Sequence, residues 1–147
     1  MVGLSKLFRR WLKHRQVAFD TSFLIPLLEE AKREGEIAGR LVRLTEKKSI
    51  LLVTSTVTLL EILVHPYQSQ DLNAVRDYYG YLTRLPLVKL VAVTPKIADE
   101  AARLRADYGF KTPDAIQLAT GILEGTTLFL TRDKEFRKQK EIEVGIL

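Results

Sequence analysis

The chain has 147 residues, enough for one domain with its own core, and 46% of them are hydrophobic while 28% are charged, as in ordinary globular proteins. It has no cysteine and only two histidines, which excludes disulfides, thiolate catalysis and cysteine-based zinc sites and argues against a histidine-rich metal site. The formal net charge of +5 originates in residues 1–16, which carry basic but no acidic residues, and such a chain fits a nucleic-acid partner, a membrane surface or simple solubility.

The first predicted element is a basic amphipathic helix over residues 1–16. Its apolar positions follow the spacing of one helix face, and they are Leu4, Leu7, Phe8, Trp11 and Leu12. This face is predicted to pack on the domain or on a second subunit, while the basic face can contact nucleic acid or a membrane. The sequence shows neither a transmembrane segment nor the apolar core of a secretory signal, so the expected location is the cytoplasm.

From residue 17 onward, short apolar runs alternate with helix-like segments. Buried strands are predicted, in chain order, at residues 17–20, 50–54, 87–93, 127–131 and 142–146. Helices are predicted over residues 22–33, 36–47, 56–65, 71–84, 95–108 and 112–123, with a short basic helix after residue 133. This alternation predicts a parallel α/β sheet covered by helices on both faces, which binds ligands at the carboxyl ends of its strands.

Capping and stop residues set the predicted helix boundaries. Ser22 and Thr112 are expected to cap the helices that follow them, and Asp133 to cap the short basic helix. Gly109 is expected to end the helix before it. The helix that begins at residue 56 or 58 is expected to end before Pro66, because proline lacks the N–H that a helix interior needs.

Four acidic residues lie at places from which their side chains can meet. Asp20 follows the first strand, Asp133 follows the fourth, Asp114 opens a helix, and Glu61 interrupts an otherwise apolar run. Carboxylates that converge on one cleft repel one another, and a divalent cation reverses the sign of that energy. Since oxygen ligands would have to bind it, Mg²⁺ or Mn²⁺ is the expected ion. The pattern suggests metal-assisted chemistry on a phosphate.

Each carboxylate also has a structural explanation when it is considered alone. Asp20, Asp114 and Asp133 lie near helix N-termini, where a carboxylate accepts hydrogen bonds from unpaired N–H groups. Glu61 is either an exposed position on an amphipathic helix or a partly buried acid that needs a partner. The combination of all four is more specific than any one of them.

The segments around these acids resemble the signature of the PIN-domain ribonucleases, and most of all the toxin-like, VapC-type branch that is paired with an antitoxin in prokaryotes. The segments are Phe19-Asp20-Thr21-Ser22, Thr58-Leu59-Leu60-Glu61-Ile62, Thr112-Pro113-Asp114-Ala115 and Thr131-Arg132-Asp133-Lys134-Glu135-Phe136. Their order and spacing match from residue 17 to the C-terminus, so the PIN-like domain is expected over residues 17–147. The basic helix of residues 1–16 lies outside the resemblance.

The resemblance implies a three-layer α/β/α sandwich around a mainly parallel five-stranded sheet in the order 3-2-1-4-5. It implies an endoribonuclease that hydrolyses RNA with Mg²⁺ or Mn²⁺, a cognate antitoxin and a homodimer. It assigns catalysis and metal binding to four carboxylates, those of Asp20, Glu61, Asp114 and Asp133. Ser22 and Thr131 match hydroxyl positions that support these carboxylates by hydrogen bonding.

Other functions agree less well with the sequence. An aspartyl phosphatase would have Asp-x-Asp after the first strand, but here the third position is Ser22. A phosphorylation receiver domain would need an acidic pair after the first strand and a positioned lysine after the last, and neither is visible. Binding of a nucleoside triphosphate would need a glycine-rich phosphate loop, which the sequence lacks. The alternative of a different class is a non-catalytic PIN-like module that binds RNA or protein, against which the complete set of four acids argues.

Overall fold

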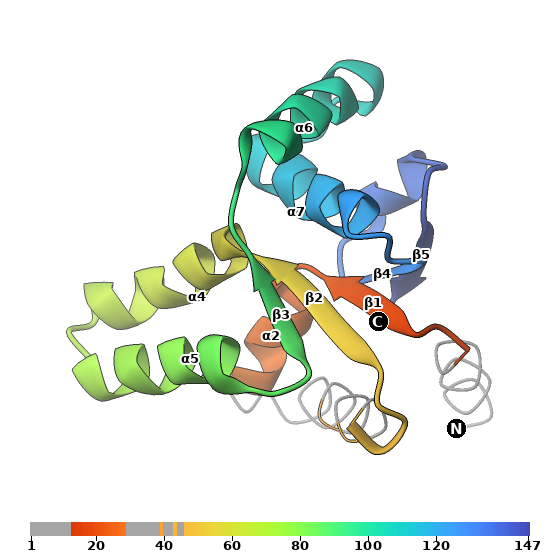
Figure 1. Cartoon of the computed structure of the whole chain (residues 1–147). Helices are drawn as coiled ribbons and strands as arrows, with labels where there is room; N and C mark the ends of the chain where they lie inside the picture. The colour runs from red at the N-terminus through yellow and green to blue at the C-terminus, as the bar shows by residue number, and fades with distance from the viewer. Residues whose placement is uncertain (1–12, 29–38, 40–42, 44–45) are drawn as a thin grey trace.

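A five-stranded parallel sheet organises the chain in the computed structural model, which describes residues 13–28, 39, 43 and 46–147 (Figure 1). The strands are β1 (Gln16–Phe19), β2 (Leu51–Ser55), β3 (Val88–Val91), β4 (Leu128–Thr131) and β5 (Glu143–Ile146). Their order is β3-β2-β1-β4-β5, and each neighbouring pair is parallel. The predicted α/β fold and the 3-2-1-4-5 order are therefore confirmed.

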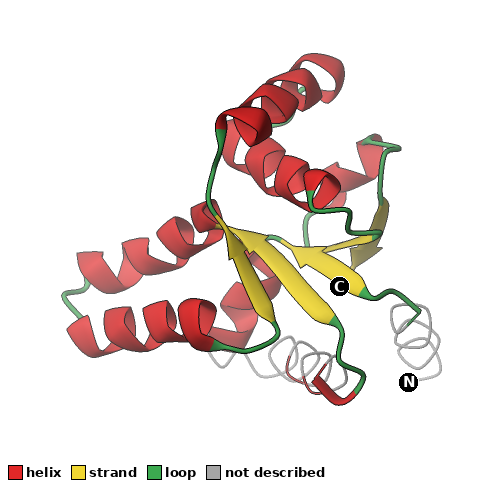
Figure 2. Cartoon of the chain, in the orientation of Figure 1, coloured by secondary structure: helices red, strands yellow, loops and turns green. Residues whose placement is uncertain are grey.

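Helices cover both faces of this sheet (Figure 2). They are α2 (Thr21–Leu28), α4 (Thr56–Gln68), α5 (Leu72–Arg84), α6 (Pro95–Tyr108), α7 (Thr112–Leu123) and the 3-10 helix η1 (Lys134–Lys138). In Figure 1, α2, α4 and α5 lie on one side of the sheet, and α6 and α7 lie on the other. None of the described helices combines the length and the apolar character needed to cross a bilayer.

Alternation along the central strands divides the core between the two faces. In β1, Val17 and Phe19 belong to the hydrophobic cluster beneath α2 and α4, whereas Ala18 belongs to the cluster beneath α6 and α7. Phe129 of β4 belongs to the same cluster as Ala18, because the two residues are paired in the sheet and point to the same face. Successive strand residues point to opposite faces, so an uninterrupted apolar run supplies both cores at once.

Two predicted caps are displaced, by two residues in α2 (from Ser22 to Asp20) and by one in α7 (from Thr112 to Lys111). Helix α2 begins at Thr21, so Ser22 lies in its first turn, and the Asp20 carboxylate accepts the hydrogen bond from the Phe23 N–H instead, at 3.3 Å. Helix α7 begins at Thr112 itself, and Lys111 at the cap position makes no side-chain hydrogen bond to the helix. In the first case the hydroxyl of Ser22 is bonded to the Asp20 carboxylate rather than to a backbone N–H of α2.

The prediction that α4 ends before Pro66 is wrong, because the helix continues through Pro66 to Gln68. Pro66 is buried, and packing of its ring offsets the backbone hydrogen bond that it cannot donate. The N–H groups of Ser69 and Asp71 bond to the carbonyls of His65 and Pro66, both at 2.9 Å, and so satisfy the end of the helix. A cap after the proline therefore ends α4.

The other predicted boundaries agree with the structure to within one or two residues where it describes them. Gly109 ends α6 with φ of 72°, in the left-handed region that glycine adopts without strain. Asp133 caps η1 through the Glu135 N–H at 2.9 Å. The helices expected over residues 1–16 and 36–47, and the end of that expected over 22–33, lie largely outside the described residues. Gln16 already belongs to β1.

Candidate active site

The carboxyl edge of the sheet places the four predicted acids on neighbouring elements. Asp20 directly follows β1, and its N–H bonds to the carbonyl of Leu130 in β4 at 3.3 Å. Asp133 follows β4 after one intervening residue, so the two aspartates leave adjacent parallel strands at the same edge. Glu61 lies on α4, which begins directly after β2, and Asp114 lies in the first turn of α7.

The Asp20 carboxylate is buried, with 4% of the residue exposed, and two hydroxyl groups fix its orientation. Ser22 Oγ donates to Oδ1 and Thr131 Oγ1 donates to Oδ2, each at 2.7 Å. Burial raises the pKa of Asp20, the bonds from Ser22, Thr131 and the Phe23 N–H oppose that rise, and the nearby Asp133 charge adds to it. Asp20 therefore occupies one defined position, in which charge is disfavoured by burial.

The two hydroxyls are themselves held by the loop that carries Asp133. Ser22 Oγ accepts from the Arg132 N–H at 2.8 Å, and Thr131 Oγ1 accepts from the Asp133 N–H at 3.0 Å. Each hydroxyl thus donates its single hydrogen to Asp20 while its oxygen accepts from the backbone. The predicted support of the acids by Ser22 and Thr131 has this geometric counterpart, and it couples the position of Asp20 to the loop after β4.

Glu61 is held by a polar network that the sequence did not reveal. Thr21 Oγ1 donates to Glu61 Oε1 at 2.6 Å, and Gln117 Nε2 lies 3.1 Å from the same oxygen. Gln117 is buried, and its amide also reaches the hydroxyls of Thr21 at 2.8 Å and Thr58 at 2.9 Å. Glu61 is thus a partly buried acid with partners, one of the two possibilities that the sequence left open.

One sequence signal for this network exists, although it is weak. Gln117 lies one turn after Asp114 on a helix whose neighbouring positions are apolar, so a buried amide there requires partners. Those partners are 96 and 59 residues away along the chain, at Thr21 and Thr58. Only the packing of α7 against α2 and α4 brings them together.

Asp114 differs from Asp20 because no hydrogen bond reaches its carboxylate from the residues that the structure describes. It is half-buried, and burial raises its pKa to about 6, with further contributions from the charges of Asp133, Asp20 and Glu61. The charge of Lys111 at the start of α7 opposes that rise. All three other acids therefore act electrostatically on Asp114, which shows that the four share one region of the molecule.

Asp133 has a structural role as well as a place beside the other acids. It caps η1, as the sequence predicted, and its charge raises the pKa of both Asp20 and Asp114. Four basic residues lie near it in the sequence, namely Arg132, Lys134, Arg137 and Lys138. Capping and participation in an acidic cleft are therefore compatible for this side chain.

The donor set fits a hard divalent cation such as Mg²⁺ or Mn²⁺ better than a softer metal that prefers nitrogen or sulfur ligands, since it consists of carboxylate and hydroxyl oxygens. The Asp114 carboxylate, which has no hydrogen-bond partner among the described residues and is destabilised by three neighbouring acids, is the group that a cation would most stabilise. Within the described part of the chain, no three acidic or histidine side chains form a ready-made ligand group. The arrangement is a cluster of four acids, in which the carboxylates of Asp20 and Glu61 are oriented by hydrogen bonds, rather than a closed coordination sphere.

Comparison with known proteins agrees with this architecture. The sequence of residues 17–142 matches the family model of the PIN domain. The chain belongs to the PIN-domain family. This PIN domain includes all four acids and both hydroxyl residues, whereas no curated protein matches the chain in sequence.

Solved structures of toxin–antitoxin proteins share the fold of this PIN domain. VapBC2 from Rickettsia felis, bound to a DNA fragment from its promoter, has a TM-score of 0.73 at 13% identity, covering 90% of this chain and 98% of that chain. VapC20 from Mycobacterium tuberculosis, a toxin that cleaves the sarcin-ricin loop, has a TM-score of 0.70 at 19% identity. The match covers 87% of this chain and 98% of that chain. A toxin–antitoxin complex from Klebsiella pneumoniae has a TM-score of 0.65 at 24% identity, covering 86% of this chain and 94% of that chain. At these identities the likeness establishes the shared, VapC-like fold.

Proposed function

We propose that this PIN-domain chain is a divalent-metal-dependent endoribonuclease that hydrolyses RNA phosphodiester bonds in the cytoplasm, as the toxin of a toxin–antitoxin pair. The observation that carries this proposal is the placement of four acids on neighbouring elements at the carboxyl edge of the sheet, where the charges of Asp133, Asp20 and Glu61 raise the pKa of Asp114. Ligands of open parallel sheets bind at this edge. Capping alone explains single acids but gives no reason for three of them to lie close enough to raise the pKa of the fourth, Asp114.

In this proposal Asp20 and Asp114 bind the principal ion, Mg²⁺ or Mn²⁺. Glu61 contacts it directly or through water, and Asp133 completes the site or binds a second ion. When bound, such an ion lowers the pKa of water toward neutrality and neutralises charge on the scissile phosphate. Without it, two unit charges at 4 Å repel by about 1 kcal/mol in water and about 4 kcal/mol at an effective dielectric of 20.

The remaining polar residues would keep these carboxylates in place during the reaction. Ser22 and Thr131 fix both oxygens of Asp20, and Thr21 and Gln117 fix one oxygen of Glu61. Groups that are already oriented need no rearrangement when charge develops on the phosphate. Asp114 is left free to adjust to the ion.

Three partners belong to the proposal: an RNA substrate, a cognate antitoxin protein and a second copy of the chain. The basic side chains around Asp133 suit the phosphates of RNA. The antitoxin is supported by the solved structures with this fold, several of which are toxin–antitoxin complexes. The homodimer rests on the resemblance to the toxin-like branch.

An RNA cleavage assay with Mg²⁺ or Mn²⁺ tests this function. Cleavage should stop with EDTA, and Asp114→Asn should lower the rate by about 100-fold or more, as loss of a charge-stabilising group does at other active sites. Asp99→Asn, the same change at an exposed position of α6, is the matched control and should cleave normally. Cleavage that ignores EDTA or persists in Asp114→Asn would contradict the proposal. Binding of RNA without cleavage would instead indicate a non-catalytic module.

A further inference from the structure

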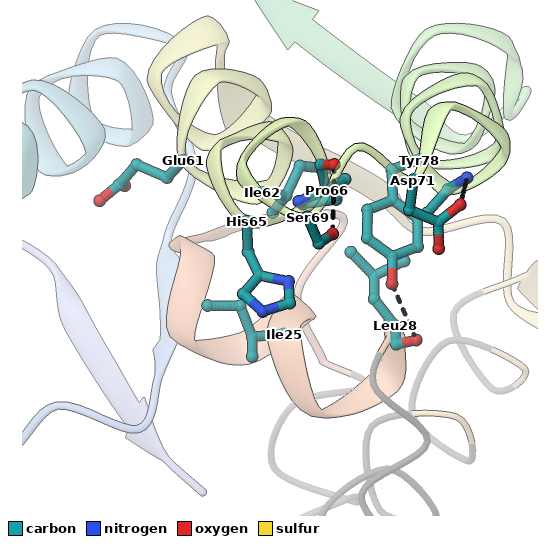
Figure 3. Close-up of a pocket in the computed structure, with 10 residues that line it drawn as sticks. Ile25, Leu28, Glu61, Ile62, His65, Pro66, Ser69, Asp71 and Tyr78 are labelled. Atoms are coloured by element: carbon teal, nitrogen blue, oxygen red, sulfur yellow. Dashed lines mark hydrogen bonds between the residues drawn. The ribbon is translucent and has the colours of Figure 1, made fainter.

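A groove of about 360 Å³ lies between α2, α4 and α5, with Glu61 among its lining residues (Figure 3). Its walls are mainly apolar, with Ile25 and Leu28 on α2, Pro66 on α4 and the ring of Tyr78 on α5. Glu61 lines the groove and also belongs to the group of four acids, so the groove borders the proposed active site at this residue.

His65 differs from three other polar side chains of this groove, each of which forms a hydrogen bond. Ser69 donates to the Pro66 carbonyl at 3.2 Å, Asp71 accepts from the Ala74 N–H at 3.0 Å, and the Tyr78 hydroxyl donates to the Leu28 carbonyl at 3.4 Å. Within the part of the chain that the structure describes, the imidazole of His65 has no such partner. It is exposed, and Figure 3 shows it extending from α4 to lie beside Ile25, one turn after Glu61.

We propose that this groove binds one base of the RNA next to the scissile phosphate, and that His65 recognises the edge of that base. The proposal rests on the proposed ribonuclease function and adds a specificity-determining residue to it. Unstacked RNA bases bind on aromatic and apolar side chains and are identified by hydrogen bonds to their edges. An imidazole offers both a donor and an acceptor for that purpose.

Charge favours a base over a phosphate in this groove, and the size of the groove suits a base. The carboxylates of Glu61 and Asp71 line the groove and oppose entry of a phosphate, whereas a base is uncharged. The volume lies near the lower end of the range of about 300–1,000 Å³ for small-molecule sites, which suits a single nucleoside. An apolar helix of a protein partner is the competing occupant, and the experiments separate the two.

The first experiment measures base discrimination on short RNAs that vary one nucleotide on each side of the cleaved bond. The wild type should prefer particular bases at one of these positions, and His65→Ala should reduce that preference by about 10-fold or more, the size of discrimination that one well-placed contact provides. The loss should fall on KM for the preferred substrate and leave its metal dependence unchanged. Gln68→Ala, an exposed change at the end of the same helix, is the matched control.

Equal cleavage of all bases by the wild type would overturn this proposal, as would unchanged discrimination in His65→Ala. If His65→Ala keeps its discrimination but loses affinity for an antitoxin helix, the groove belongs to a protein partner, and base recognition is wrong.

The second experiment does not require cleavage. The chain has only two histidines, so His65→Gln assigns their ring signals in an NMR spectrum. Adding nucleoside monophosphates should shift the signals of His65 and leave those of His14, which bonds to Thr127 at 2.6 Å, in place. No shift with any of the four nucleotides, or an equal shift with inorganic phosphate alone, would overturn the base site. A base-dependent shift in a protein that cleaves no RNA would preserve the groove while refuting the proposed function.

Discussion

At the scale of single residues, the acids of this site differ in how the protein holds them. Asp20 has hydrogen-bond donors on both carboxylate oxygens, whereas Asp114 has none among the described residues. Both carboxyl groups have raised pKa values, with burial as the largest cause. Asp20 therefore serves as the fixed reference of the site, while Asp114 responds most directly to the charge around it.

The two roles of Asp20, as a helix cap and as a proposed metal ligand, predict different outcomes for two substitutions. Asp20→Asn keeps the cap and removes a buried charge, so the free energy of unfolding of the metal-free protein should stay within about 1 kcal/mol of wild type or rise. Asp20→Ala removes the cap as well and should cost about 0.5–2 kcal/mol. Both variants should lose RNA cleavage.

Urea denaturation in EDTA and a cleavage assay on each variant check this prediction. If the Asp20→Asn protein is as stable as wild type and still cleaves RNA, Asp20 acts only as a cap. The stability of Asp20→Ala serves as the internal measure of what the cap contributes.

At the scale of the helices and strands, local sequence patterns predicted the elements well but their long-range contacts poorly. Apolar runs predicted the five strands, and Gly109 and Asp133 marked helix boundaries correctly. Pro66 was misjudged because its burial and the cap beyond it depend on tertiary packing. The role of Gln117 depends on residues from α2 and α4 that no local pattern connects to it. The acids themselves were identified by their types and their order.

The contact of α7 with the sheet gives a test at this scale, because α7 carries both Asp114 and Gln117. A Cβ added at Gly121 would lie 2.9 Å from Ala18 Cβ and 3.1 Å from Thr126 Oγ1, so the helix would have to move away from β1. Gly121→Ala should therefore cost about 1–3 kcal/mol despite the better helix propensity of alanine. The displacement should also reduce cleavage.

Gly80→Ala in α5 is the matched control for this substitution. The nearest atom to its added Cβ is the end of the Arg84 side chain at 3.9 Å, so the intrinsic preference for alanine should dominate and stabilise the protein by about 0.5–1 kcal/mol. Thermal denaturation of both variants measures the change in stability that each substitution causes. Equal effects of the two changes would contradict the close packing of α7 on β1.

At the scale of the whole molecule, a cluster of four acids lies in a chain with a net charge of +5. Positive potential draws a polyanion toward the surface, whereas the acidic cluster repels it until a cation is bound. The fold brings the four acids together from the ends of separate elements, so folding itself creates their mutual repulsion. The stability of the metal-free protein should therefore depend on the protonation of these acids.

Asp114 sets the direction of that dependence, since its pKa rises from 3.8 to about 6 on folding. Between these values the folded state binds more protons than the unfolded state, so stability falls as the pH rises. The contribution is fully present below about pH 3.8 and is lost above about pH 6, although solvent screening reduces its size for this half-exposed group. Asp114→Asn should flatten this part of the stability profile.

Mg²⁺ should reverse the trend, because a ligand that binds the folded state stabilises it and binds best when Asp114 is deprotonated. Thermal denaturation with EDTA or Mg²⁺ at about pH 5 and about pH 7.5, on either side of the pKa of Asp114, measures the effect. The increase in Tm should be larger at the higher pH and absent in Asp114→Asn. An equal increase at both pH values, or the same increase in the variant, would mean that the ion binds away from this carboxylate, and the repulsion among the four acids would then have no connection with metal binding.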